Sequence, residues 1–440
     1  MSFGTRTGLL LAGAALGLAV TGAATAATDD EIAALRAQIR SMQQRLDELE
    51  AKQDETEDEV EAAKEGTLSA GSMPGRYKLP GSDTEIEIGG YVKADVIYDV
   101  DESVGDLFVT ENISTGDGDD ESGVRLHARQ SRLFVKTYTP TEWGELATHI
   151  EGDFFGNGGN EVFSNSYSFR LRHATATIGP LRVGQYWTNF MPIESYPATV
   201  DFQGPAGIPF IRQTQIRYTH DLDDNLSLSA SLENAEFSGK GIEGGDLVRF
   251  EESDADTGIR AGIDKGPDLV GAARYRDDWG LVKLAGVARW FGSPDDGDGD
   301  FGWGLNLSGH TELWAGGKAL GSVTYGEGVG RYIVNGRGQD GIVDADGDVA
   351  AVTSWGLTAG LSQDLTDELT AAVAYGRFQV EDQVALGADL DNTNSVHTSL
   401  FWNPLERLTI GGEVMWGNRE DADGASDDAL RVQSAVQVNF

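Results

Sequence analysis

Apolar and polar side chains alternate along most of the chain, starting near residue 85. In the first such run, Ile86, Val92 and Val96 fall on one face, and Lys93 and Asp95 fall on the other. A period of two predicts β-strands with one apolar face, which occur in sandwiches and in transmembrane barrels. Sixteen runs are predicted, near residues 85–100, 124–138, 145–155, 166–178, 181–187, 211–220, 225–236, 268–276, 279–291, 301–313, 318–329, 352–363, 368–380, 394–402, 406–417 and 429–440.

The connections between these runs alternate strictly between two kinds. One set is short, such as Gly179-Pro180 and Asn403-Pro404, and the other is long, rich in glycine and acidic. The long connections are 101–123, 156–165, 237–267, 292–300, 330–351, 381–393 and 418–428. Short turns at one end and long loops at the other are typical of outer-membrane barrels. Residues 85–440 are therefore predicted to form an all-β transmembrane barrel of about sixteen antiparallel strands.

The last run ends at Phe440, after Val432, Val436 and Val438 on the same face. A terminal phenylalanine after alternating apolar positions resembles the signal by which barrel-assembly machinery recognises its clients. This end predicts a location in the outer membrane of a Gram-negative bacterium, in contact with lipid and lipopolysaccharide.

The N-terminal part is predicted to contain an export signal, a helix and a linker. Residues 1–27 have a basic start at Arg6, a short apolar core and a small-residue cleavage site, as a signal peptide does. Residues 28–65 are predicted to form a periplasmic α-helical coiled coil that self-associates or contacts peptidoglycan; a single amphipathic helix on its own barrel is the alternative. Its heptad positions are Ile32, Leu35, Ile39, Met42, Leu46, Leu49, Gln53, Thr56, Val60 and Ala63. Residues 66–84 are rich in Gly, Ser and Pro and are predicted to be a flexible linker.

Residues 188–210 break the alternation and differ from the other long connections. The segment contains four prolines and few charges, so a solvent-exposed loop of this composition would be unusual. We expect a constriction loop that folds into the barrel; an external loop in subunit contact is the alternative. Its candidate residues are Phe190, Glu194, Tyr196, Asp201 and Phe202.

The alternation also predicts which charges face the lumen. Leu133, Phe169 and Leu171 would face lipid, so the basic residues between them would face inward, because a charge facing lipid at mid-membrane costs ~2–4 kcal/mol. The predicted pore-lining residues are Arg132, Lys136, Arg170, Arg172, Arg182, Gln213, Gln215, Arg217, Arg274 and Arg289. Glu194 and Asp201 of the loop are expected to face these arginines. An excess of base at the narrowest point predicts a preference for small anions, and guanidinium groups favour carboxylates. A second interpretation is that these arginines only hold the loop.

The net charge of −39 argues against a nucleic-acid partner, whose phosphates need clustered lysines and arginines. The acidic residues crowd the predicted coiled coil and external loops, whereas the basic residues lie on the predicted wall. The chain has no cysteine, and its six histidines are scattered without the spacing of metal ligands. No cofactor or metal is predicted, and an enzyme is not favoured.

Two further alternatives remain at this point. The runs 295–300 and 344–348 resemble parts of calcium-binding loops, but Trp355 stands where the second would need a glutamate. Solvated loop tips are therefore favoured over a calcium-binding surface protein. The chain could also be an envelope tether, in which the coiled coil contacts the cell wall and the barrel conducts little. A conductance measurement separates a pore from a tether.

Two short runs resemble the DcaP-like porins: Arg129-Gln130-Ser131-Arg132 and Phe169-Arg170-Leu171-Arg172-His173-Ala174. Residues 183–191, 199–205 and 212–218 resemble the same family. The resemblance covers the export signal, the coiled coil and the barrel, and is most specific across 124–220. It implies a homotrimer of sixteen-stranded barrels, a periplasmic N-terminal coiled coil, and uptake of small anions such as dicarboxylates.

Overall fold

The structure, a computed structural model, describes residues 29–65, 67–116, 121–160, 162, 164–243, 246–251, 264–293, 297–344, 346–382 and 389–440. The predicted signal peptide, residues 1–27, lies outside these residues. The chain divides into two units, residues 1–67 and 68–440. No helix in the described part of the chain has the length and apolar character needed to cross a membrane.

The first unit contains one helix, α1 (Asp29–Glu65). It covers the predicted coiled-coil segment almost completely. Four of the predicted heptad positions, Ile39, Met42, Leu46 and Leu49, are between 47% and 66% exposed. The structure therefore confirms a helix, and the apolar face of this helix is exposed.

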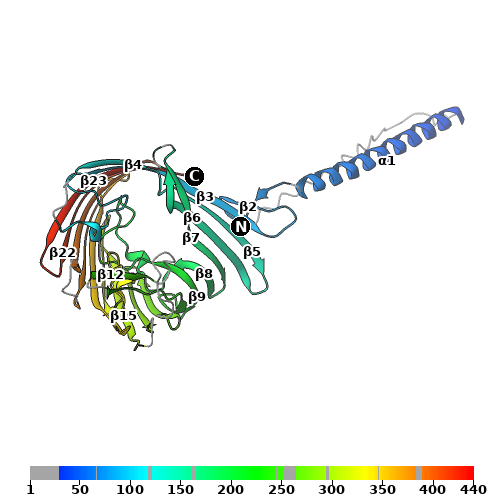
Figure 1. The fold of residues 1–440 in the computed structure, drawn as a ribbon. Helices are drawn as coiled ribbons and strands as arrows, with labels where there is room; N and C mark the ends of the chain where they lie inside the picture. Colours follow the sequence, from blue (N-terminus) through cyan, green and yellow to red (C-terminus); the bar gives the residue numbers. More distant parts are fainter. Residues whose placement is uncertain are drawn as a thin grey trace. The chain divides into compact units, whose positions relative to one another are not determined.

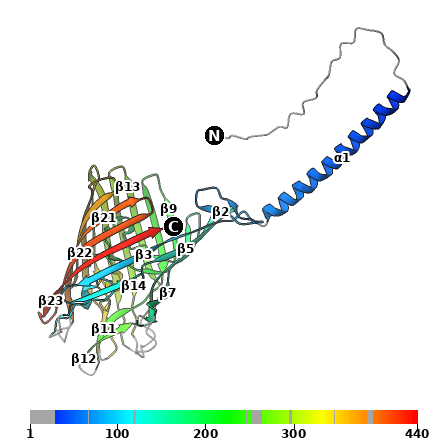
Figure 2. The same cartoon turned by 90° about the horizontal axis from the view of Figure 1, so that it is seen from above.

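The second unit is built around a closed antiparallel barrel (Figures 1 and 2). Each strand pairs with its neighbour along the chain, and the last strand pairs with the first, with Val436 opposite Ala94. The sixteen strands are β3 (Glu85–Asp99), β5 (Arg132–Thr141), β6 (Gly144–Asn160), β7 (Ser166–Ile178), β8 (Leu181–Trp187), β9 (Arg212–Asp221), β10 (Leu226–Glu233), β13 (Asp268–Asp277), β14 (Gly280–Trp290), β15 (Phe301–Trp314), β16 (Gly317–Glu327), β19 (Thr353–Asp364), β20 (Leu369–Val380), β21 (Leu390–Leu405), β22 (Leu408–Asp421) and β23 (Ser426–Asn439). The prediction of a sixteen-stranded barrel is confirmed.

Side chains alternate across the barrel wall as the sequence pattern requires. On β3, Val92 and Val96 are 57% and 43% exposed on the outside, whereas Lys93 and Asp95 are buried inside. The chain closes where the Phe440 amide donates to the Gly90 carbonyl at 3.1 Å. Closure removes every free strand edge, which is the condition for a sheet to cross a bilayer.

Several boundaries differ from the prediction. The second barrel strand is interrupted, because β4 (Gly123–His127) and β5 pair with successive halves of β3. The ends of β6, β21, β22 and β23 that adjoin the long connections extend into segments predicted as loops. Only residues 422–425 connect β22 to β23. Both faces of these strand ends carry polar residues, so the period of two is not visible there in the sequence.

The predicted linker is partly ordered as strand. Two short strands, β1 (Ser69–Ala70) and β2 (Arg76–Lys78), pair with each other, and β2 pairs with the start of β3. The guanidinium carbon of Arg76 lies 3.3 Å from the centre of the Tyr138 ring. These strands extend the sheet at the end of the barrel that carries the short turns.

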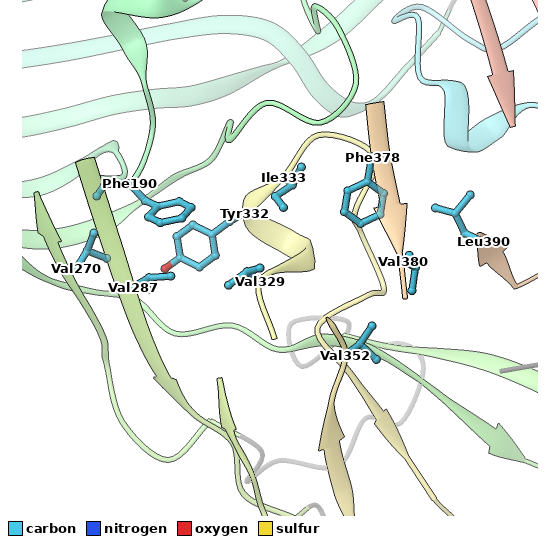
Figure 3. Packing of buried hydrophobic residues seen from close by; sticks show 11 residues of the cluster. Phe190, Val270, Val287, Val329, Tyr332, Ile333, Val352, Phe378, Val380 and Leu390 are labelled. Carbon is cyan, nitrogen blue, oxygen red and sulfur yellow. The ribbon is translucent and has the colours of Figure 1, made fainter. Parts of the chain in front are cut away.

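Three long connections fold inward. They are residues 188–210, which include η2 (Ile193–Ser195), a connection with η1 (Thr110–Asn112) and one with η3 (Gly330–Tyr332). The latter two were expected to be exposed acidic loops, and that expectation is wrong for their apolar parts. Phe108 and Ile113 pack on Met415, and Tyr332 packs on Phe190, as Figure 3 shows for the latter pair.

A small second sheet joins two of the long connections. It consists of β11 (Ser238–Glu243), β12 (Asp246–Glu251), β17 (Gly341–Val343) and β18 (Val349–Ala351). β11 pairs with β17 in parallel, so the connection after β10 is tied to the connection after β16. The Ser238 amide at the start of β11 donates to Asp340 at 2.9 Å, just after η3, which also ties the two connections together.

The loop 188–210 docks on the opposite wall through glycines. At Gly207, where φ is +79°, an added Cβ would meet the Arg377 carbonyl oxygen at 1.9 Å. A Cβ at Gly356 would meet the Gly207 carbonyl at 2.1 Å, and one at Gly376 would meet the Ala206 carbonyl at 2.1 Å. The backbone of the loop therefore lies directly against β19 and β20, and a side chain at any of these positions would separate them.

Substitution of Gly376 by leucine tests this docking. The new side chain meets the backbone of Ala206, so we expect the loop to leave the wall at a cost of about 1–3 kcal/mol, as for other overpacked sites. Single-channel conductance in a planar bilayer should rise, while the heat-modifiable gel shift of the folded barrel is retained. Gly412, which has open space around it, is the matched control, and Gly412→Leu should leave conductance unchanged. Equal conductance of both variants and the wild type would contradict the docking.

Candidate solute pathway beside the inserted loop

Carboxylates and an ammonium group hold the loop 188–210 across the lumen. At β22, the Glu413 carboxylate accepts the backbone amides of Asp201, at 2.8 Å, and of Val200. His397 Nδ1 lies 2.7 Å from the same carboxylate. Lys93 Nζ donates to the Val200 carbonyl at 2.7 Å. At the end of β10, the Glu233 carboxylate accepts the backbone amide of Asn189 at 2.8 Å. The loop thus has buried charged partners at both ends.

Several side chains of the loop bind the loop itself or the connections packed against it. Phe190 is 0% exposed, and Tyr196 donates to the Gln203 carbonyl. Burial raises the pKa of the Tyr196 phenol, which keeps it a neutral donor. Asp201 accepts the amides of Gln203 and Phe108 at 2.8 and 3.0 Å. The expectation that Asp201 faces the wall arginines is therefore wrong, because backbone amides already use its carboxylate.

Glu194 does face basic residues of the wall. Its carboxylate accepts two hydrogen bonds from Arg274, at 2.6 and 3.0 Å, and another from Arg276. Arg276 was not predicted. The loop therefore presents one acidic side chain to the wall rather than two.

The wall of β5–β7 and the start of β9 carries what we call the upper basic cluster: Arg132, Arg170, Arg172 and Arg212. Arg170 binds Asp153 through two hydrogen bonds of 2.9 and 2.8 Å. Arg172 binds Glu151 at 2.9 Å and Asp153 at 3.2 Å, and its side chain is only 3% exposed. Four cations and two carboxylates leave an excess of positive charge at the loop.

A β-bulge positions this cluster. Leu171 pairs with Gly152 and His173 with Glu151, so Arg172 has no partner of its own on β6. As a result, Arg172 and His173 both point inward and are buried. A bulge places two consecutive side chains on one face, which strict alternation cannot predict.

Arg212 is the member of the cluster that the alternation missed. It stands at the first position of β9, where strand geometry does not yet fix the side chain, and its guanidinium carbon lies 4.8 Å from the centre of the Trp187 ring. Among the described residues it forms no ion pair, and its buried Nη1 has no hydrogen-bond partner. The aromatic residues Trp187, Phe202 and Phe155 line the same region.

Below the loop, toward the short turns, lies a cavity of about 410 Å³. Its lining includes four basic residues, Arg182, Arg217, Arg274 and Lys283, which we call the lower basic cluster. Lys283 was not predicted; its Nζ donates to the carbonyls of Asn189 and Met191 at 2.7 and 2.9 Å and so holds the start of the loop.

Four predicted pore-lining residues point inward but bind protein groups. Arg289 is 0% exposed and binds Asp340 at 2.9 Å and Asp268 at 3.2 Å, so the prediction that it contacts solutes is wrong. Gln213 and Gln215 are also buried, bound to Glu233 and to backbone carbonyls. Lys136 pairs with Glu87 at 3.0 Å but stays partly exposed.

No cluster of three or more histidines and carboxylates suited to a metal ion occurs in the part of the chain that the structure describes. The calcium-like runs 295–300 and 344–348 lie partly outside that part. His149, Glu151 and His173 lie together, but Arg132 and Arg172 surround them, and this positive charge opposes a metal cation.

The chain is similar to known outer-membrane proteins. Residues 18–258 match the family model of the DcaP outer membrane protein. Porin Omp2b of Brucella suis is 26% identical over 334 residues, which cover 72% of this chain and 84% of the relative. Porin Omp2b of Brucella canis is 27% identical over 316 residues, covering 68% and 76%.

Solved structures share the fold. The crystal structure of the outer membrane channel DcaP of Acinetobacter baumannii matches with a TM-score of 0.70 and 20% identity, over 82% of this chain and 99% of that chain. An anion-selective porin from Comamonas acidovorans matches with a TM-score of 0.52 and 13% identity, over 81% and 100%.

The two arginines that approach Trp187 should differ in their effect on stability. Arg172→Ala leaves the buried carboxylates Glu151 and Asp153 short of a partner, and loss of one partner of a buried pair costs about 3–5 kcal/mol. Arg212→Ala removes a cation without a carboxylate partner and should cost much less. Urea unfolding of the barrel in detergent, followed by tryptophan fluorescence, measures both values. Equal midpoints for the two variants would contradict this assignment.

Proposed function

The chain belongs to the DcaP outer membrane protein family, and on that premise we propose that it is a porin of the Gram-negative outer membrane. It allows passive diffusion of small hydrophilic solutes and favours anions such as dicarboxylates. The relatives that carry the name porin and the fold of an anion-selective porin support this proposal.

The observation that carries the anion preference is the excess of base beside the inserted loop. The upper basic cluster has four arginines against Glu151 and Asp153. Arg132 Nε lies 3.5 Å from Glu151, but Arg212 has no ion-pair partner among the described residues and its Nη1 has no hydrogen-bond partner, so a small change of its side chain would offer an unused donor to an anion. Arg170 is 30% exposed beside them. Donors of this kind stabilise an oxyanion more than a cation at the same place.

The strongly negative total charge does not oppose this preference. Exposed charges farther away than about 10 Å are largely screened at 0.1 M salt, whereas charges at the constriction are screened much less. The partly buried cations beside the loop therefore act on a solute at its narrowest passage, and the acidic residues at distant loop tips act weakly there.

The outer face of the barrel supports a position in lipid. Apolar side chains such as Val92, Val436 and Leu305 are exposed around the wall, which suits contact with membrane lipid and lipopolysaccharide. A homotrimer is part of the proposal, because solved structures with this fold include a trimer form of OmpT of Vibrio cholerae. After export, the exposed heptad face of α1 would pair with the same face of other copies in the periplasm, where it can also reach peptidoglycan.

Reversal potentials in a planar bilayer test the anion preference. With a KCl gradient, we expect chloride to permeate more readily than potassium, and Arg132→Ala with Arg212→Ala should bring the two permeabilities closer together. Succinate should block the channel, and Arg170→Ala should weaken that block about tenfold, since a hydrogen bond to a charged group contributes about 1.5–3 kcal/mol. Arg407, in an exposed turn, is the control, and Arg407→Ala should change neither quantity.

The same recordings separate the alternatives. A preference of the wild type for potassium would overturn the anion selectivity. Absence of conductance from a correctly folded barrel would favour the tether over the pore.

Cysteine cross-linking tests the pairing of α1. The chain has no cysteine, so a single introduced thiol reports only on its own position. Leu46 lies on the heptad seam and Gln44 on the opposite face, so Leu46→Cys should give a covalent dimer on mild oxidation and Gln44→Cys should not. Non-reducing electrophoresis of the membrane-inserted protein measures both. Cross-linking at both positions, or at neither, would contradict a heptad seam.

A further inference from the structure

Two arginines face each other across neighbouring strands in the lower cavity. Arg182 on β8 and Arg217 on β9 are direct register partners. Like charges opposite each other destabilise a sheet, and the Cβ atoms of such partners are only about 4.5–5.5 Å apart. Among the described residues, neither arginine forms an ion pair with a carboxylate. The pair is therefore unfavourable unless a further group compensates for it.

The hydrogen bonds of this pair leave donors unused. Arg182 stacks at 4.3 Å on the Tyr186 ring, and its Nε lies 3.4 Å from the Thr177 hydroxyl. Arg217 donates through Nη2 to the Trp187 carbonyl at 2.6 Å, but its buried Nε has no hydrogen-bond partner. A buried donor without an acceptor costs about 1–3 kcal/mol, so an acceptor at this place would be stabilising.

The rest of the lining adds hydrogen-bond donors and two acidic residues. Lys283 donates to two loop carbonyls, those of Asn189 and Met191. The hydroxyl groups of Ser227 and Ser308 line the same space. The acidic residues of the lining are Glu194 and Asp221, and Glu194 is already bound by Arg274 and Arg276. The three arginines of the lining, Arg182, Arg217 and Arg274, thus outnumber its two carboxylates.

The upper and lower basic clusters are separate sites in the lumen. Trp187 stands between them, because Arg172 and Arg212 lie over its ring while Arg217 binds its backbone carbonyl. The lower cavity is lined by the ends of β8, β9, β10, β13, β14 and β15 that adjoin the short turns. A solute would therefore reach it from the side of the short turns, or only after it had passed the loop.

We propose that this lower cavity is a second anion site, built for a phosphate-type dianion, either free or as a small monoester. Two guanidinium groups from adjacent strands can converge on one ligand group, and a tetrahedral oxyanion accepts donors from several directions at once. A carboxylate is planar and is satisfied by a single guanidinium fork. The volume leaves room for a phosphate that carries a small organic group. This proposal rests on the proposed porin function and adds a second binding site for anions, on the short-turn side of the loop.

Blockade recordings from the side of the short turns test the site. Inorganic phosphate and glycerol 3-phosphate are added to that side at pH 8, and we expect block by either or both to weaken about tenfold or more in Arg182→Ala and in Arg217→Ala, since each loses hydrogen bonds to a charged group. Arg377→Ala is the matched control, since Arg377 stacks on Trp355 and does not line the cavity.

The two phosphates distinguish the source of the ligand. Stronger block by inorganic phosphate would assign the site to the free anion, and stronger block by glycerol 3-phosphate would assign it to monoesters. Unchanged block in both arginine variants, or the same loss in Arg377→Ala, would overturn the site.

A crystallographic measurement separates this proposal from the porin function. Crystals of the full chain soaked in selenate, a tetrahedral dianion, should show anomalous density between Arg182 and Arg217 that is lost in Arg217→Ala. That outcome would support the site even if the reversal potential contradicted anion permeation. Anomalous density at the upper basic cluster alone would overturn the lower site and leave the proposed porin function intact.

Discussion

The closed hydrogen-bond ladder is the constraint on which the rest of this structure depends. Once β23 pairs with β3, every strand has two neighbours and no edge remains, so each side chain must face either the outside or the lumen. Apolar residues occupy most of the outer positions, and most charged residues of the strands face the lumen. The lumen of such a barrel would be wide, and what fills it decides which solutes can pass.

The inserted loop and two further connections fill much of that lumen. Their backbone amides and carbonyls are buried, so each needs a partner, and the wall supplies Glu413, Glu233, Lys93 and Lys283 for the loop. The η3 segment is held by Arg289, which lies between Asp268 and Asp340. Burial raises the pKa of the Asp340 carboxyl, although Arg289 and Arg331 oppose that effect. Many inward charges of this barrel therefore hold loops in place.

The inward-facing arginines fall into two groups, with and without a carboxylate partner. Arg172 and Arg289 have carboxylate partners and almost no exposure, whereas Arg182, Arg212 and Arg217 have no ion-pair partner among the described residues. A buried or half-buried cation without a carboxylate is costly in a fold that otherwise pairs its charges. Such residues are the strongest candidates for contact with a passing anion, and they lie above and below the loop.

The sequence determined the barrel, its number of strands, its apolar outer face and the family, because period-two alternation and alternating connection lengths are local patterns. It also indicated that residues 188–210 differ from the other connections, since that segment is apolar and rich in proline. Tertiary structure alone decided which inward residues are available to solutes. A bulge turned His173 inward beside Arg172, a strand start turned Arg212 toward Trp187, and folded loops covered Arg289 and Gln213. These outcomes depend on contacts between segments far apart in the chain, which strand periodicity does not encode.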